Sequence, residues 1–215
     1  KILYEDPHLL LIEKPVGVPS QDTENDCVPR RLAAIGYPVK TVHRLDKPTG
    51  GVMAYARTDK AAAKLSSLVG QHTLFIKEYL AVVQECPAEN TGTLTDLLYH
   101  DVRRNKSYTV TRLRKGVREA KLEYTVLETI TNNEGTFSLL LVRLHTGRTH
   151  QIRIHMKHIG YPLVGDYLYN PDMEFIGRQA LHSHKMRFRH PITGEMMEFA
   201  APLPEDMRRV LYPEK

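Results

Sequence analysis

The chain has only two cysteines and no tryptophan among its 215 residues. Cys27 and Cys86 lie far apart and form no Cys-x-x-Cys pair, which argues against a disulfide framework and against a thiolate metal site. No segment approaches the roughly 20 consecutive apolar residues of a membrane span, and the first residues do not resemble a signal peptide. We therefore expect a soluble, cytoplasmic protein. Because the sequence begins with Lys1, we also expect a few leading residues to be missing from it.

A chain of this length suits one domain and is long enough to bury roughly 70% of the surface of its unfolded state. It contains no internal repeat, no low-complexity tract and no obvious linker. We therefore expect residues 1–215 to form a single domain.

Short apolar runs bounded by turn residues predict a strand-rich fold. We expect strands at residues 2–4, 9–12, 51–56, 78–83, 122–130, 137–144, 181–188 and 196–199. Helical spacing predicts helices at residues 27–35, after a cap at Thr58 or Asp59, and at residues 149–159 and 205–211. Strands outnumber helices and short hairpin connections are frequent, so the fold class is α+β with a mixed, mainly antiparallel sheet.

The run from His43 to Gly51, HRLDKPTGG, places one carboxylate between cationic residues next to a glycine-rich turn. Positive charge at Arg44 and Lys47 favours an ionised Asp46, because a cation within about 4–6 Å lowers the pKa of a carboxyl group. An ionised aspartate acts as a nucleophile or a base. Taken alone, the run also fits a surface ion-pair cluster, which is the more common structure.

The net charge of +5 is modest, but its distribution along the chain is uneven. Residues 103–118 hold seven basic side chains and no acidic one. The seven are Arg103, Arg104, Lys106, Arg112, Arg114, Lys115 and Arg118. This stretch has the composition of a surface that contacts RNA phosphates, and it equally fits a solvated loop or an edge strand protected by charge.

A second cationic segment, residues 144–155, carries Arg148 and Arg153 with three histidines around a glycine turn. The two guanidinium groups could share one carboxylate or clamp a phosphate. His150, His155 and His158 lack zinc-hydrolase spacing, and no acidic residue lies between Thr146 and Gly165, so we expect no metal. RNA contact and ordinary packing both remain open for these histidines.

Lys77 and Tyr79 are predicted to open a strand. The tyrosine offers an aromatic face on which a base can stack. A single tyrosine on a strand is more often part of the core, so this segment alone supports no function.

Together these segments resemble the RluA-type family of RNA pseudouridine synthases over residues 2–207. The matching pieces are residues 13–17 (EKPVG), 43–46 (HRLD), 77–79 (KEY), 146–153 (TGRTHQIR), 160–166 (GYPLVGD), 181–182 (LH) and 188–191 (FRHP). Any one of these pieces would be weak evidence, but their number, order and spacing agree with the family.

The resemblance implies the pseudouridine synthase fold, with a mixed, mainly antiparallel sheet flanked by helices and loops around a catalytic cleft. It implies that Asp46 is the catalytic aspartate, Arg153 its ion-pair partner and Tyr79 the residue stacked on the target uracil. It also implies that Arg44 takes the place of the flipped base. By their positions in the matching motifs, we assign substrate contacts to Arg44, His43, Arg148, His150 and Lys77.

Isomerising uridine breaks the C1′–N1 bond, turns the base and joins C5 to C1′, with no redox step. We therefore expect no cofactor, a pocket that excludes water, and ribosomal or transfer RNA as the partner. Moving the target base out of its stack costs a few kcal/mol, which stacking and an inserted arginine offset. We further expect no membrane partner and a monomeric protein.

Two features depart from the family. The chain has Thr49-Gly50-Gly51 where Thr-Ser-Gly is usual after the aspartate, so the loop geometry can differ. The N-terminal S4-type RNA-binding domain of many members is absent from these residues, which leaves RNA binding to the catalytic domain or to sequence upstream.

Two other functions compete with the synthase. One is a non-catalytic RNA-binding or ribosome-assembly protein that keeps the fold. The other is a glycoside or nucleoside hydrolase, which would need a second carboxylate near Asp46.

Overall fold

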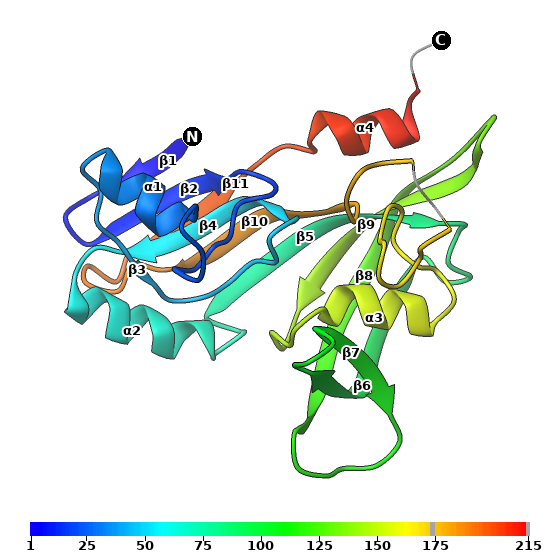
Figure 1. Cartoon of the computed structure of the whole chain (residues 1–215), viewed down its shortest axis with the longest axis horizontal. Helices are drawn as coiled ribbons and strands as arrows, with labels where there is room; N and C mark the ends of the chain where they lie inside the picture. The colour runs from blue at the N-terminus through cyan, green and yellow to red at the C-terminus, as the bar shows by residue number, and fades with distance from the viewer. Residues whose placement is uncertain (173–174, 214–215) are drawn as a thin grey trace. The chain divides into compact units, whose positions relative to one another are not determined.

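The computed structural model describes residues 1–172 and 175–213, which contain eleven strands and four helices (Figure 1). The strands are β1 (Ile2–Glu5), β2 (Leu9–Lys14), β3 (Lys40–Thr41), β4 (Gly50–Ala56), β5 (Phe75–Gln84), β6 (Thr91–Asp101), β7 (Lys106–Val110), β8 (Val117–Asn132), β9 (Gly135–Leu144), β10 (Leu181–Arg189) and β11 (Met196–Ala200). The helices are α1 (Val28–Ala34), α2 (Asp59–Val69), α3 (Gln151–His158) and α4 (Glu205–Leu211). The chain divides into two compact units, residues 1–77 with 182–202 (unit 1) and residues 78–181 with 203–215 (unit 2).

Unit 1 is built on strands in the order β1-β2-β4-β10, with β3 also paired to β4 and β11 to β10. These pairs are antiparallel except β4 with β10, which run parallel. Every residue of β4 is buried, as its continuous apolar sequence predicts for a central strand. Helix α2 lies against β4, and Thr58 caps it by accepting a hydrogen bond from the Ala61 N–H. Phe75 and Phe188 stack in the core with ring centroids 4.9 Å apart.

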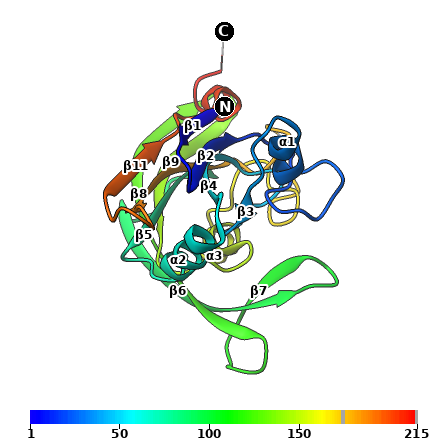
Figure 2. The ribbon, with the colours of Figure 1, turned by 90° about the vertical axis from the view of Figure 1, so that its left-hand side faces the viewer.

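Unit 2 contains the antiparallel order β5-β9-β8-β6-β7, where β5 contributes its residues from Glu78 onward. Helix α3 packs on β6 and β7, and α4 packs on β9. Strands β6 and β7 form the outer antiparallel pair of this order, called the ribbon here, which both views show in green (Figure 1, Figure 2), and β6 pairs with β8 on its other side. This part of the sheet packs on α3, because Leu98 of β6 and Ala120 of β8 form a buried cluster with Ile154 and Tyr169.

The structure confirms the α+β class, the mixed, mainly antiparallel pairing and all of the predicted helices and strands. Several boundaries differ, and the largest shift is in β8, which begins at Val117 where the sequence predicted residue 122. Helix α3 is shorter than residues 149–159, and the turn between β8 and β9 is only Asn133–Glu134. Strand β5 begins at Phe75, so Lys77 lies inside it and does not open it.

Strands β3 and β6 were absent from the sequence-based prediction. The burial of β6 alternates and most of its residues are only half-buried. Its partner β7, which was predicted only as one alternative for the basic stretch 103–118, is the last strand in the order of unit 2. The stretch therefore comprises this edge strand, the turns on either side of it and the first two residues of β8. This position agrees with the expectation of an edge strand protected by charge.

Gly51 allows β4 and β10 to approach each other at the point where they pair. Its φ is +111°, and a Cβ atom there would lie 2.1 Å from the backbone oxygen of Ser183, its partner in the register. A side chain at this position therefore meets both backbone strain and a collision that no side-chain movement relieves.

We expect Gly51→Ala to lower the free energy of unfolding by at least about 3 kcal/mol, or to prevent folding. Gly36→Ala is the matched control, because Gly36 has a φ of +89° but open space where its Cβ would lie. Strain alone predicts a loss of about 1–2 kcal/mol for the control. Urea unfolding of both variants measures the difference, and equal losses would show that the contact with Ser183 relaxes.

Candidate active site

Asp46 lies in an irregular segment, residues 42–49, that joins β3 to β4 in unit 1 and is called the aspartate loop here. The loop closes with a turn in which the Thr49 N–H donates to the backbone oxygen of Asp46 at 2.9 Å. Asp46 is half-buried, whereas Arg44 is exposed and Leu45 is buried. The sequence correctly placed Asp46 in a loop just before a buried strand.

The buried ammonium group of Lys14 holds the loop on one side of Asp46. Lys14 is 1% exposed, and its Nζ donates to the backbone oxygens of Pro15, Val18 and Lys47 at 2.8, 2.7 and 3.2 Å. A buried charge is tolerated only when it is well hydrogen-bonded, and here three carbonyl dipoles provide those bonds. The backbone directly after Asp46 is therefore tied to the end of β2.

Ser20 holds the loop on the other side of Asp46. Its hydroxyl donates to the Leu45 oxygen at 2.8 Å and accepts the Leu45 N–H at 3.1 Å. The Tyr55 hydroxyl in turn donates to the Ser20 oxygen at 2.7 Å. Both backbone neighbours of Asp46 are thus fixed by buried groups, which positions the aspartate through its main chain.

The partner of Lys47 differs from the expectation that this residue supports the charge of Asp46. The Lys47 ammonium lies 2.7 Å from a carboxylate oxygen of Glu24, and both side chains are about half exposed. An exposed pair of this kind contributes little energy, so it acts mainly to direct the lysine side chain toward Glu24.

His43 is a buried part of unit 1. Its Nε2 accepts the N–H of Ala54 on β4 at 3.1 Å, and its ring packs edge-on against Phe75. Burial, together with the nearby Lys77 ammonium, lowers the pKa of His43 to about 3, so the ring is neutral at pH 7. The hydrogen bond with Ala54 attaches the first residue of the HRLD run to the buried strand β4.

Lys77 is buried in the same part of unit 1. Burial lowers the pKa of its ammonium group to about 8. A lysine with this pKa carries its charge at pH 7 against a desolvation cost. Titratable groups held in such a state are concentrated at functional sites.

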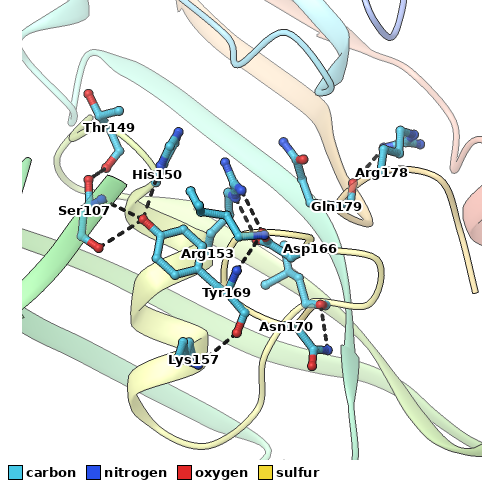
Figure 3. A network of polar contacts seen from close by, with 12 residues as sticks. Ser107, Thr149, His150, Arg153, Lys157, Asp166, Tyr169, Asn170, Arg178 and Gln179 are labelled. Carbon is cyan, nitrogen blue, oxygen red and sulfur yellow. Dashed lines mark hydrogen bonds and ion pairs between the residues drawn. The ribbon is translucent and has the colours of Figure 1, made fainter. Parts of the chain in front are cut away.

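Arg153 forms a buried ion pair with Asp166 in unit 2 (Figure 3). Its Nε and Nη2 atoms donate to the two carboxylate oxygens of Asp166, both at 2.7 Å. The two side chains are 2% and 0% exposed. This two-pronged geometry fixes the plane of the guanidinium group as well as its position.

Gly165 explains why the carboxylate reaches Arg153. With a φ of +69°, a Cβ atom at this position would lie 2.2 Å from the backbone oxygen of Arg178. Only glycine allows the chain to pass so close before Asp166. The same carboxylate accepts the N–H groups of Leu168 and Tyr169 at 3.1 and 3.2 Å, so it also shapes the turn that follows.

The other predicted contact residues of unit 2 lie on several elements. Tyr79 is a buried residue of β5, paired with Val142 of β9. Arg148 is exposed, and its Nε donates to the Glu119 oxygen at 3.0 Å. His150 is buried at the start of α3, in a left-handed conformation with a φ of 57°. Arg148 and Arg153 are thus directed to different acceptors in unit 2.

Of the seven basic residues of the stretch 103–118, Lys106 lies on β7, Arg118 lies at the start of β8, and the other five lie in the turns on either side of β7. Arg103 and Arg104 are in the turn between β6 and β7, and six of the seven side chains are exposed. Lys106 is half-buried, with its ammonium 5.4 Å from the centre of the Tyr169 ring. Arg114 lies 5.2 Å over the ring of Tyr99. The cations are therefore distributed over β7, the turns on either side of it and the start of β8.

His155 and His158 contact an acidic residue of β6. Both lie near the Asp96 carboxylate, with nitrogen–oxygen distances of 3.8 Å for His155 and 3.1 Å for His158. Burial lowers the pKa of His155 to about 4. Across residues 1–172 and 175–213, no group of three or more His, Cys, Asp and Glu side chains is arranged to hold a metal ion. Within the same ranges, no helix combines the length and apolar character needed to cross a membrane.

Sequence reasoning assigned no positioning role to Lys14, Ser20, Asp166 or Tyr169. Two signals for them were present: a lysine at the end of β2, two residues after its apolar run, and an aspartate directly after a glycine. Neither signal names a partner, because each partner lies far along the chain or in another element.

Comparison with known proteins matches residues 8–158 to a family described as RNA pseudouridylate synthase. A protein of Bacillus subtilis named uncharacterized RNA pseudouridine synthase YhcT is 34% identical over 97% of this chain and 70% of its own length. The ribosomal large subunit pseudouridine synthase D of Haemophilus influenzae is 35% identical over 98% of this chain and 69% of its own length.

Among solved structures, human RNA pseudouridylate synthase domain containing 4 superposes with a TM-score of 0.77 at 23% identity. The match covers 98% of this chain and 91% of that chain, and it shows a shared fold. The family match and the relatives above 30% identity confirm the RluA-type assignment made from the motifs. The chain therefore belongs to the RNA pseudouridylate synthase family, whose reaction is the isomerisation of uridine to pseudouridine in RNA.

Proposed function

We propose that the protein isomerises specific uridines of structured ribosomal RNA, with transfer RNA as the alternative substrate, and that Asp46 is its catalytic aspartate. The observation that carries the proposal is the aspartate loop: a half-buried carboxylate whose two backbone neighbours are fixed by the buried Lys14 and Ser20. Ribosomal RNA is preferred because relatives in three bacteria carry the name ribosomal large subunit pseudouridine synthase D.

The proposed roles of the other residues follow from their chemistry. Arg153 is the ion-pair partner of Asp46 during the reaction, and its fixed guanidinium plane in the pair with Asp166 supports that role. Tyr79 stacks on the target uracil, and Arg44, which is exposed, fills the space that the flipped base leaves. His43, Lys77, Arg148 and His150 are proposed to contact or position the nucleotide.

The proposed enzyme is a single catalytic domain of residues 1–215 that acts as a monomer without a cofactor. Ribosomal RNA as the substrate makes the cytoplasm its proposed location. The seven cations of the stretch 103–118 are proposed to contact RNA phosphates, since they lie on or next to the edge strand β7 and six of them are exposed. Light scattering of the purified chain, alone and with RNA, tests the monomeric state.

Asp46→Asn is expected to lower turnover at least about 100-fold while leaving the fold intact, because the change removes the charge and keeps the shape. The assay is tritium release from large-subunit ribosomal and transfer RNA transcripts labelled at uridine C5. Asp59→Asn is the matched control, since Asp59 is an exposed aspartate of unit 1 on α2.

Two outcomes would contradict this proposal. Full activity of Asp46→Asn would remove Asp46 from the chemistry, and RNA binding without tritium release by the wild type would favour a non-catalytic RNA-binding protein. Release of free uracil in the same reactions would indicate a hydrolase.

Lys77→Met is expected to make the protein more stable at pH 7 while lowering its activity. Below pH 8 the lysine is charged in both states, so folding bears the whole desolvation cost, on the order of 3 kcal/mol. As the pH rises from about 8 toward 10.5, the folded state binds fewer protons than the unfolded state and the wild type gains stability.

Urea unfolding of wild type and Lys77→Met from pH 7 to pH 10 measures this difference. The stability gap should narrow as the pH rises. A gap independent of pH would show that the amine is not desolvated, and unchanged activity would remove Lys77 from the substrate contacts.

The triple variant Arg103→Ala, Arg112→Ala, Lys115→Ala is expected to weaken RNA binding and to reduce its dependence on salt. Each phosphate contact contributes about 0.7–0.9 to the slope of log K against log salt, so the slope should fall by about 2–3. Filter binding from low to high salt measures it. The double variant Lys60→Ala, Lys64→Ala, which removes two exposed cations of α2, is the control, and an equal loss in that protein would show that the basic stretch has no special role.

A further inference from the structure

The ring and the hydroxyl group of Tyr169 contact two parts of unit 2 that differ in function. On one side is Arg153 with its partner Asp166, and on the other is β7, the edge strand of the ribbon. Figure 3 shows the tyrosine between Ser107 of β7 and Arg153 of α3. Tyr169 is 2% exposed, so these contacts are shielded from water.

The hydroxyl group of Tyr169 forms hydrogen bonds with the backbone of the edge strand β7. It accepts the Ser107 N–H at 2.8 Å and donates to the Ser107 oxygen at 3.1 Å. It therefore bonds the main chain of β7, the last strand in the order of unit 2, in the way that a neighbouring strand would. The Nδ1 atom of His150 lies 3.2 Å from the same hydroxyl group, and since the hydroxyl proton points to Ser107, the histidine is the donor there.

The ring and backbone of Tyr169 position the arginine. The Arg153 guanidinium carbon lies 5.1 Å from the centre of the ring, within the range of a cation–π contact. The Asp166 carboxylate that binds Arg153 also accepts the Tyr169 N–H, and Lys157 donates to the Tyr169 oxygen at 2.9 Å. The Asp166 carboxylate and the Lys157 ammonium thus hold the backbone of Tyr169, and its ring lies within cation–π distance of the Arg153 guanidinium group.

A second bond joins β7 to the segment before α3. The Ser107 hydroxyl donates to the Thr149 oxygen at 2.7 Å, directly before His150. His150 is held in a left-handed conformation, which costs of order 1–3 kcal/mol in a residue other than glycine. Strain of this kind persists only where the surroundings fix the backbone, as Ser107 and Tyr169 do here.

We infer that Tyr169 is a positioning residue that fixes the Arg153 guanidinium group by tying α3 to the main chain of the basic ribbon. RNA bound on the ribbon and the arginine of the reaction are thereby held in one geometry. The inference rests on the proposed function for its catalytic consequence, but its structural part, the link from Ser107 to Arg153, is independent of that function.

The test is Tyr169→Phe, which keeps the ring and removes the hydroxyl group. Tyr124→Phe is the matched control, because Tyr124 is another buried tyrosine of unit 2 whose hydroxyl donates to a backbone oxygen, that of Glu89. Single-turnover rates at saturating RNA and dissociation constants are measured separately, at a temperature at which both variants are folded. We expect the rate to fall at least about tenfold in Tyr169→Phe with RNA affinity kept within about twofold, and neither to change in the control.

A second measurement needs no activity. The Nε–H signal of Arg153 in a nitrogen–proton spectrum is assigned by its loss in Arg153→Lys, and its exchange with solvent is followed. Exchange should be at least about tenfold faster in Tyr169→Phe and unchanged in Tyr124→Phe. In the wild type, the Ser107 amide should exchange as slowly as this Nε–H although it lies on an edge strand.

The outcomes separate the inference from the proposed function. Wild-type activity with equal rates in the two variants, or unchanged Arg153 exchange in Tyr169→Phe, overturns the positioning role and leaves the synthase in place. An inactive wild type overturns the proposed function, and the exchange measurements then decide the structural link alone. A Ser107 amide that exchanges rapidly in the wild type overturns the link even if Tyr169→Phe fails to fold.

Discussion

The buried pair of Arg153 and Asp166 is the interaction on which the organisation of unit 2 around α3 depends. Pairing two ions inside a protein contributes little net stability, because desolvation offsets the attraction between them, whereas removing one partner costs about 3–5 kcal/mol. The main effect of the pair is therefore to fix the position and orientation of the Arg153 guanidinium group. The Asp166 carboxylate binds two guanidinium nitrogens and two backbone N–H groups, so it fixes an arginine and the following turn at once.

Unit 1 solves a similar problem with different chemistry. Its aspartate loop is held by a buried ammonium group and a serine hydroxyl that bond to the backbone on both sides of Asp46. The position of the carboxylate is therefore set through the main chain of its two neighbours.

Several residues are held in states that cost stability. Lys77 keeps its charge at pH 7 in a buried place, and His150 keeps a left-handed backbone at the start of α3. Both residues lie in segments that the family motifs identify. Desolvated charges and strained backbone conformations that lower stability are concentrated at functional sites, where the rest of the fold offsets their cost.

The sequence alone determined the fold class, nearly every element, the family and the place of Asp46 before a buried strand. These properties are written in local patterns: apolar runs, turn residues and short motifs. The sequence did not reveal the short strand β3, the half-buried strand β6 or the true partner of Lys47, and it left β7 as one of two alternatives for the basic stretch. The tertiary structure decided which groups position the reactive ones, because Lys14 reaches a carbonyl 33 residues away and Tyr169 bonds a residue 62 positions away. Such contacts depend on how distant segments pack, and no local periodicity of the chain encodes that packing.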